Sequence, residues 1–281
     1  MPPVPSESVK PLVVIEANGG GGTFDFAEFW EYRQLLLFFI WRDTLLRYKQ
    51  TMLGALWEIV KPLSFMIIYS VFLGYVLRIS TDGIPYPLFY YSGLVIWGFF
   101  AQAVTAGSAS VVSSANLVNK VYFPRIILPV SAVLSNLVDL MIASLLLIFL
   151  MLYYKVTPSV SLLLVPFPLL LAVLTSLGIA FLFSALIARF RDFQNVLTVG
   201  TTLWMFLTPI IYPVSMVPEN WQWLYSFNPM TAATTGFRWA LLGSSTVDWK
   251  LVVPGSIMAL VIFVAGLVTF TRSEKSFPHW L

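Results

Sequence analysis

The sequence contains no cysteine, one histidine and few charged residues. Without cysteine it can form no disulfide and no zinc–thiolate site. With His279 as its only histidine, it lacks the residues for a Ser-His-Asp triad or a multi-histidine metal site. The net charge of +3 is too small for a nucleic-acid surface, so no nucleic-acid partner is expected.

A phosphate-binding loop is also missing, because no Gly-Lys-Ser or Gly-Lys-Thr occurs in the chain. The glycine run at residues 19–22 is better explained as part of a linker. No constellation of carboxylates, histidines or cysteines supports the covalent chemistry of a membrane enzyme. We therefore expect no catalytic residue, no ATP site and no cofactor or metal bound by this chain.

Hydrophobic residues dominate what is present. They make up 58% of the 281 residues, whereas charged residues make up 10%, against about 25% in a soluble domain. Mean hydropathy is +0.84. A soluble fold of this size could not cover so much apolar surface with polar side chains. The composition therefore predicts an all-α integral membrane protein that crosses the bilayer several times.

Six apolar stretches can each hold the ~20 residues that a membrane-spanning helix needs. They lie at about residues 56–77 and within the intervals 82–120, 125–155, 155–189, 192–212 and 250–272. With the N-terminus in the cytoplasm, twelve of the 16 Lys and Arg residues fall on the cytoplasmic side, which satisfies the positive-inside rule. We therefore expect a six-helix domain over residues 51–272, a cytoplasmic tail over 273–281 and both termini in the cytoplasm.

The N-terminal region divides into two parts. Residues 1–23 carry the Pro, Gly and Ser residues typical of a flexible tail. Residues 24–50 mix aromatic and charged residues at helical spacing, and their longest uncharged run, 34–41, is too short to cross a bilayer. This pattern predicts an amphipathic helix in the membrane interface. A soluble helix packed on a partner is the alternative.

The stretch between the last two predicted spans, residues 213–250, is too apolar for a solvated loop. Its aromatic residues and its break at Asn228-Pro229 predict two short re-entrant half-helices at the outer side. An amphipathic surface hairpin is the alternative. We interpret the stretch as an outer gate whose candidate residues are Trp221, Trp223, Tyr225, Asn228, Pro229 and Arg238.

Asp139 is the one charge deep inside a predicted span. It lies on a helical stripe with Ser131, Ser135 and Ala143, and small polar stripes of this kind favour close packing between helices. We favour a structural role at a helix or subunit contact. A place on a substrate path and a part in proton coupling are the alternatives.

Aromatic residues are abundant, with 23 Phe, 12 Tyr and 10 Trp. Many belong to interfacial belts or to the core. Aromatic rings also offer flat apolar faces to the C–H bonds of sugars, while Tyr and Trp keep a hydrogen-bonding edge. A path lined by such rings could pass a glycan without tight binding of any one sugar.

Several motifs occur in the order found in one known family. They are RYKQTMLG at residues 47–54, YSGL at 91–94, NLVNKVYFPR at 116–125, RD at 191–192, NPM at 228–230 and FR at 237–238. On these motifs the chain resembles the permease subunit of bacterial polysaccharide ABC exporters of the ABC-2 type. It is most similar to O-antigen export permeases, with teichoic-acid export permeases as near relatives.

The resemblance implies partners. Two permease copies would form the membrane pathway as a homodimer, among membrane lipids, and two separate ATP-binding subunits would dock beneath them. ATP and Mg would be bound by those subunits. The loop that contacts them would contain Asn116, Lys120, Tyr122, Phe123, Pro124 and Arg125.

The resemblance also implies a cargo, a long glycan on undecaprenyl diphosphate that crosses the bacterial inner membrane outward. The diphosphate would enter beside the interfacial helix, attracted by Arg42, Arg47 and Lys49. Ordinary anchoring to lipid headgroups is the alternative for these cations. Export of capsular polysaccharide or teichoic acid, a small-molecule or drug ABC permease, and a channel or secondary carrier without an ATPase are the alternatives for the whole chain.

Overall fold

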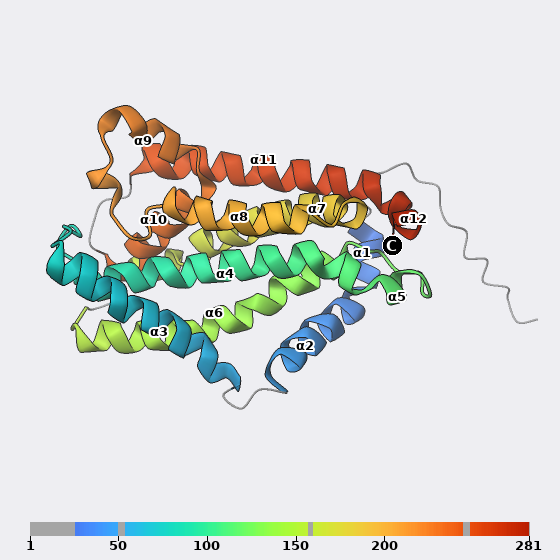
Figure 1. Cartoon of the computed structure of the whole chain (residues 1–281), viewed down its shortest axis with the longest axis horizontal. Coiled ribbons are helices and arrows are strands. Elements are labelled where there is room, and N and C mark those ends of the chain that lie inside the picture. The colour runs from blue at the N-terminus through green and yellow to red at the C-terminus, as the bar shows by residue number, and fades with distance from the viewer. Residues whose placement is uncertain (1–25, 50–53, 157–159, 244–247, 281) are drawn as a thin grey trace, which may run out of the picture.

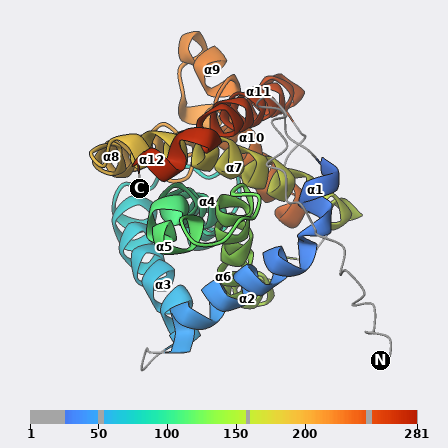
Figure 2. The ribbon, with the colours of Figure 1, turned by 90° about the vertical axis from the view of Figure 1, so that its right-hand side faces the viewer.

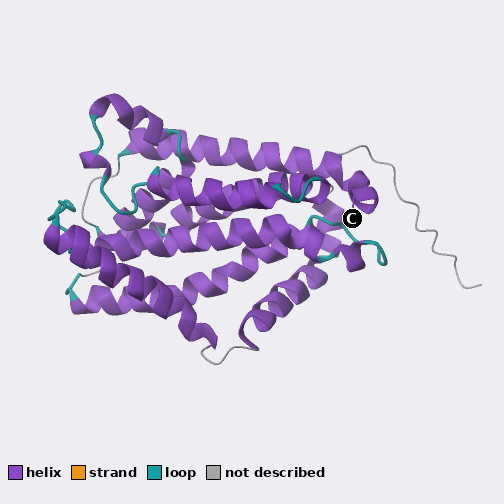
Figure 3. Cartoon of the chain, viewed as in Figure 1, coloured by secondary structure: helices purple, strands orange, loops and turns teal. Residues whose placement is uncertain are grey.

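Helices are the only regular elements in the part of the chain that the computed structural model describes, residues 26–49, 54–156, 160–243 and 248–280 (Figure 3). The tail predicted over residues 1–23 lies outside this part. Long helices run side by side along the longest axis, and shorter helices lie at both ends (Figure 1). The prediction of an all-α protein is confirmed.

The two ends of the bundle carry different short elements (Figure 1). The end that we call the α5 end holds α5 (Ala115–Val118), η5 (Glu274–Ser276) and α12 (Phe277–Trp280). The opposite end, which we call the α9 end, holds η4 (Val214–Met216) and α9 (Glu219–Ser226). These two names are kept below.

Residues 26–49 form two helices, α1 (Phe26–Glu31) and α2 (Arg33–Lys49), where the sequence predicted one. Helix α2 lies obliquely across α6 (Figure 2). Phe39 of α2 is buried. Large apolar side chains on α2 that stay exposed are Leu37, Phe38, Trp41, Leu45 and Leu46. An apolar face of this kind suits a helix in the membrane interface, and that location stays a prediction.

Five stretches of helix are long and apolar enough to cross a membrane, namely Gly54–Val76, Tyr86–Ser113, Ile127–Tyr153, Val160–Arg189 and Trp249–Ser276. The first joins η1 (Gly54–Leu56), α3 (Trp57–Tyr69) and the π-helical η2 (Ser70–Val76). The others are α4 (Tyr86–Ser113), α6 (Ile127–Tyr153), η3 (Val160–Leu164) with α7 (Pro166–Arg189), and α11 (Trp249–Ser273) with η5. Five of the six predicted spans thus have the expected length and composition.

The predicted fifth crossing corresponds to α8 (Phe193–Phe206), which has only 14 residues. At 1.5 Å per residue α8 is about 21 Å long, shorter than the ~30 Å of a hydrocarbon core. The helix stops before Pro209, which lacks an N–H group and disfavours helical geometry in the residue that precedes it. A sixth crossing through α8 stays a prediction.

Two short helices, α9 and α10 (Pro229–Leu242), lie between α8 and α11, where the sequence predicted two half-helices. They differ in environment. Helix α10 packs against α4, α7 and α11, and most of its residues are buried. Helix α9 buries only Ser226 and exposes its tryptophans. Their depth in a bilayer stays a prediction.

The core of the bundle is formed by α4, α6, α7, α10 and α11. The closest approach joins α7 to α11. A Cβ atom added at Gly178 would lie 2.6 Å from the carbonyl carbon of Ile262 and 2.7 Å from the Cα of Phe263, and one added at Gly266 would overlap the carbonyl of Gly178. Glycine at both positions lets the two backbones touch, as small residues do between membrane helices.

The last described residues are folded onto the bundle. Residues 274–280, which the sequence predicted as a tail, form η5 and α12. Phe277 is fully buried, and its ring lies 5.2 Å from that of Phe270 at the end of α11. Burial of a whole aromatic side chain accounts for this docking, because it removes a large apolar surface from water.

Candidate functional site

A loop at the α5 end, residues 115–126, has an exposed tip and an anchored base. Asn116, Lys120 and Tyr122 are exposed, Pro124 and Arg125 are half-buried, and Phe123 is buried. The Phe123 ring packs edge-on against Phe39 of α2 at 6.0 Å. The six residues predicted for coupling therefore lie together, but only three of them present their side chains outward.

The base of this loop is tied to the end of α11. The backbone N–H of Arg125 donates to Glu274 Oε1 at 2.9 Å, and the Arg125 guanidinium donates to the Glu274 carbonyl oxygen. At the tip, the Tyr122 hydroxyl donates to Glu28 Oε1 of α1 at 3.3 Å. Burial raises the pKa of Tyr122, and the Glu28 carboxylate raises this pKa further, so the hydroxyl stays protonated as a donor.

Helix α2 docks on α6 through a polar cluster. Arg47 forms an ion pair with Asp139, and its guanidinium also donates to Asn136 Oδ1 and Ser135 Oγ, both at 3.0 Å. The Tyr48 hydroxyl donates to Asp139 Oδ1. Asp139 is 3% exposed, and a carboxylate so deeply buried is stable as an ion only when it is paired. The predicted polar stripe of α6 is thus the surface on which α2 packs.

The three cations predicted to attract a lipid diphosphate differ in their surroundings. Arg42 pairs with Asp43 at 2.7 Å and lies over the Phe39 ring at 4.4 Å. Arg47 is paired with Asp139. Lys49 is exposed at the end of α2. Of the three, Arg42 and Arg47 line one cavity of about 280 Å³ together with Asp43 and with serines of α4 and α6.

Asn228 joins the start of α10 to the end of α8. Its Oδ1 accepts the Met230 N–H at 3.0 Å, which caps α10, and the Trp204 indole N–H at 3.0 Å. Its Nδ2 donates to the Leu207 carbonyl oxygen at 3.2 Å and to Thr208 Oγ1 at 3.1 Å. Pro229 follows as the first residue of α10, where a missing N–H has no cost.

Arg238 of α10 is 6% exposed and faces backbone carbonyls instead of a carboxylate. Its Nε donates to the Phe89 oxygen of α4 at 3.1 Å, Nη2 donates to the Ile210 oxygen at 2.7 Å, and Nη1 donates to the Pro209 oxygen. The guanidinium carbon lies 3.7 Å above the Phe89 ring. Glycine at position 93 leaves room for this side chain, because a Cβ added there would lie 2.3 Å from Nη2 of Arg238.

The remaining predicted gate residues lie on α9. Trp221 and Trp223 are 58% and 60% exposed, so neither ring is held by the core. The Tyr225 hydroxyl hydrogen-bonds to that of Tyr212 at 2.6 Å, which ties α9 to the segment after α8. The predicted gate set therefore divides into residues that hold the backbone, Asn228, Pro229 and Arg238, and exposed tryptophans.

Sequence reasoning missed the partners of these residues. Glu274, Phe39 and the carbonyls at 209 and 210 were not singled out, and backbone carbonyls carry no signal in a sequence. In the described ranges, no group of three or more His, Asp or Glu side chains could hold a metal ion.

Substitution of Arg238 tests the carbonyl cluster. Arg238→Met should lower the melting temperature of the detergent-solubilised protein sharply, because each buried carbonyl left without a donor costs about 1–3 kcal/mol. The melting temperature of Arg238→Lys should lie between those of the wild type and Arg238→Met, since one ammonium group cannot reach three carbonyls. Lys250→Met, an exposed cation at the same end, serves as the control. Equal melting temperatures for Arg238→Met and Lys250→Met would refute this role.

A double-mutant cycle tests the contact between α2 and α6. Arg47→Met leaves the Asp139 side chain, 4% exposed, without its cation and should destabilise the protein by about 3 kcal/mol. Asp139→Leu should cost less, because Arg47 is 27% exposed and can turn toward solvent. The double variant should recover most of the loss. Denaturant titration in detergent gives the free energy of unfolding of each variant, and from these values the coupling energy between the two side chains. If the losses of the two single variants simply add up in the double variant, the pair is not stabilising.

Comparison with known proteins agrees with the long apolar helices of this chain. The chain matches the model of the ABC-2 type transporter family over residues 34–242. It is 28% identical over 241 residues to an O-antigen export system permease protein RfbA of Klebsiella pneumoniae, covering 85% of this chain and 92% of that protein. A protein of the same name from Myxococcus xanthus is 27% identical over 252 residues, with 88% and 96% covered.

A more distant relative is the polysialic acid transport protein KpsM of Escherichia coli, which is 23% identical over 243 residues, with 84% of this chain and 92% of that protein covered. The family match spans more than half of the chain and agrees with the resemblance of its motifs. The chain is therefore a multi-pass membrane permease that belongs to the ABC-2 type transporter family.

Proposed function

We propose that this chain is the membrane-spanning subunit of an ATP-driven exporter of an O-antigen-type polysaccharide. The cargo is linked to undecaprenyl diphosphate and moves from the cytoplasmic to the periplasmic side of the bacterial inner membrane. The observation that carries the proposal is similarity to O-antigen export permeases over about 85% of the chain. Two copies of the chain form the pathway, and two ATP-binding subunits drive it.

The loop at the α5 end is the proposed contact with the ATP-binding subunit. Its exposed side chains Asn116, Lys120 and Tyr122 form a polar surface. Its base is bonded to Glu274 at the end of α11 and packed on Phe39 of α2. A displacement of the tip would therefore reach a long helix and the interfacial helix together, because bonded and packed groups move as one body.

The proposed point where the lipid diphosphate enters is the cavity between α2, α4 and α6. The wall of this cavity carries Arg42, Arg47 and Asp43. Both arginines are already paired, Arg42 with Asp43 and Arg47 with Asp139, which lies outside the wall. Guanidinium binds phosphate through two parallel hydrogen bonds, and Arg42 could exchange Asp43 for it. We assign contact with the diphosphate to Arg42 and Lys49, and docking of α2 to Arg47.

The proposed exit is at the α9 end. Asn228 and Arg238 hold α10 against α4 and the end of α8, whereas α9 packs on α11 and is tied to the segment after α8 by the Tyr225 hydroxyl. Trp221 and Trp223 offer exposed rings on which the C–H faces of sugars can stack. In this proposal α10 stays fixed and α9 moves when the glycan leaves.

Deletion of the gene in its native host tests the cargo. Long glycans on undecaprenyl diphosphate should accumulate inside the inner membrane while surface O-antigen is lost, because synthesis continues without export. Extraction of lipid-linked glycans and mass spectrometry of the anchor give the result, and the wild-type gene should restore export. A phospholipid-type anchor would indicate capsule export, and an unchanged surface with no retained glycan would refute polysaccharide export.

Arg125→Ala tests coupling to ATP hydrolysis. The variant keeps the backbone bond to Glu274 Oε1 and loses the bond from the guanidinium. Export and substrate-coupled ATPase activity should fall by roughly tenfold or more, the loss expected for one charged hydrogen bond. Arg33→Ala, an exposed arginine at the same end, is the control. Unchanged export and ATPase activity in Arg125→Ala would show that the contact between the loop and Glu274 does not couple ATP hydrolysis to export.

A further inference from the structure

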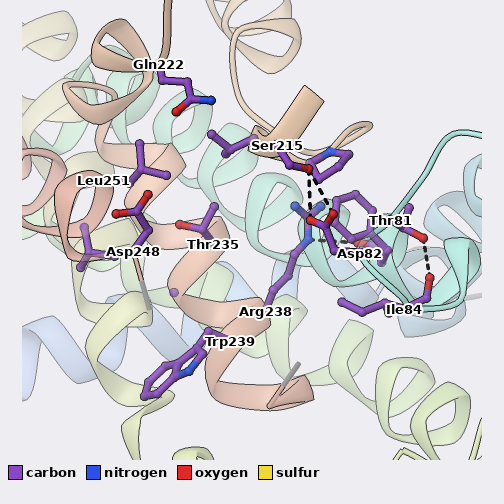
Figure 4. A pocket seen from close by; sticks show the side chains of 15 residues that line it. Thr81, Asp82, Ile84, Ser215, Gln222, Thr235, Arg238, Trp239, Asp248 and Leu251 are labelled. Carbon is purple, nitrogen blue, oxygen red and sulfur yellow. Dashed lines mark hydrogen bonds between the residues drawn. The ribbon is translucent and has the colours of Figure 1, made fainter. Parts of the chain in front are cut away.

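A pocket of about 280 Å³ opens at the α9 end, away from the loop at residues 115–126. Its walls come from six places along the chain, namely the turn at 81–84, α4, the segment at 213–215, α9, α10 and the start of α11. The polar side chains on these walls are Thr81, Asp82, Ser215, Gln222, Thr235, Arg238 and Asp248 (Figure 4).

The two carboxylates of the pocket retain hydrogen-bonding capacity. Asp82 accepts the Ser215 hydroxyl at 3.1 Å, and Asp248 Oδ1 accepts the Lys250 N–H at 3.0 Å as the cap of α11. A carboxylate has about four acceptor positions, so both can accept further donors. Figure 4 shows them on opposite sides of the view with Thr235 between them.

The neutral polar groups add both donors and acceptors. The Gln222 side-chain nitrogen donates to the Val217 carbonyl oxygen at 2.9 Å, which leaves its amide oxygen and a second N–H group. The Thr235 hydroxyl donates to the Thr231 carbonyl oxygen at 2.6 Å and still offers lone pairs. The half-buried Trp239 ring lines the lower part of the view in Figure 4 and gives an apolar face.

The charge of the pocket disfavours anions. Asp82 and Asp248 are negative, and among the described residues of its walls Arg238 is the one cation. Three N–H groups of Arg238 already donate to the carbonyls of Phe89, Pro209 and Ile210. A diphosphate or an acidic sugar would therefore meet two carboxylates and a guanidinium that is largely engaged.

We propose that this pocket binds one neutral or amino sugar unit of the glycan as it leaves at the α9 end. Such a sugar offers several hydroxyl donors to the carboxylates and a C–H face to Trp239. The volume lies just below the ~300–1,000 Å³ of pockets for drug-sized ligands, which limits the occupant to about one ring. The inference rests on the proposed function and adds a place where the moving glycan pauses.

An occupant of the pocket would touch α9, α10 and the start of α11 at once. Helix α9 contributes Gln222, and α10 contributes Thr235 and Trp239. A bound sugar would therefore bridge α10 and α9, because it bonds to both. Each sugar unit that enters would hold α9 in place until the next one displaces it.

Sugar binding to the full-length protein in lipid nanodiscs of phosphatidylethanolamine and phosphatidylglycerol tests the proposal. The probes are free glucose, mannose, galactose, N-acetylglucosamine and glucosamine, with glucuronic acid as the anionic probe, and saturation-transfer difference NMR reports binding. At least one neutral or amino sugar should bind in the millimolar range, and glucuronic acid should bind more weakly. Preference for glucuronic acid, or binding of no probe, would overturn the proposal.

Substitutions of the two pocket carboxylates test whether the sugar binds in this pocket. Asp82→Asn and Asp248→Asn remove charge but preserve the fold, since Asn tolerates the φ of +52° at residue 82 and caps a helix as well as Asp does. The double variant should raise the Kd of the bound probe by roughly tenfold or more. Asp192→Asn, at the start of α8 and the opposite end, is the control and should leave the Kd unchanged.

Binding that survives the double substitution would place the sugar elsewhere and overturn the proposal. This readout does not depend on the deletion experiment. If the deletion strain accumulates a lipid-linked glycan but no probe binds, the pocket inference fails and the proposed function stands. If a probe binds as expected but no glycan accumulates, the proposed function fails while the sugar site stands.

Discussion

Backbone hydrogen bonding inside an apolar bundle is the constraint on which this structure depends. Helix α8 stops before Pro209, and residues 209 and 210, which follow it, are buried. Arg238 of α10 donates to the carbonyls of Pro209 and Ile210, and Asn228, the N-cap of α10, donates to the carbonyl of Leu207 at the end of α8. Because α10 satisfies these carbonyls, it is buried against α4 and α7, and its outer residues form the walls of the polar pocket. The position of α9, which precedes α10 directly, follows from the same contacts.

Other polar contacts join side chains of segments that lie far apart in the sequence. Arg47 reaches residues of α6 that are 88 and 89 positions away, and Arg125 reaches Glu274 across 149 positions. These contacts close the bundle around helices that otherwise meet through apolar and small side chains. The loop at the α5 end and the polar pocket at the α9 end thus lie at opposite ends of a packed core.

Local patterns in the sequence were enough to predict the membrane class, five of the long helices and the two short helices around Asn228-Pro229. Hydropathy and proline positions are local properties, so they carry this information. The length of α8 was overestimated because apolar residues continue past Pro209 although the helix does not. The partner of Asp139 was not predictable, since nothing local relates residue 139 to residue 47. The carbonyl partners of Arg238 were even harder to predict, because backbone atoms are the same at every position. The docking of Phe277 was not predictable either, because it depends on a tertiary contact alone.

The contact between Gly178 and Gly266 has a consequence for transport. Where two backbones touch, no side chain stands between α7 and α11 that could rotate aside to make an opening. Hydrogen-bonded helices do not bend around a solute at such a seam without loss of their own bonds. At this seam α7 and α11 therefore leave no space between them for a sugar or a lipid tail.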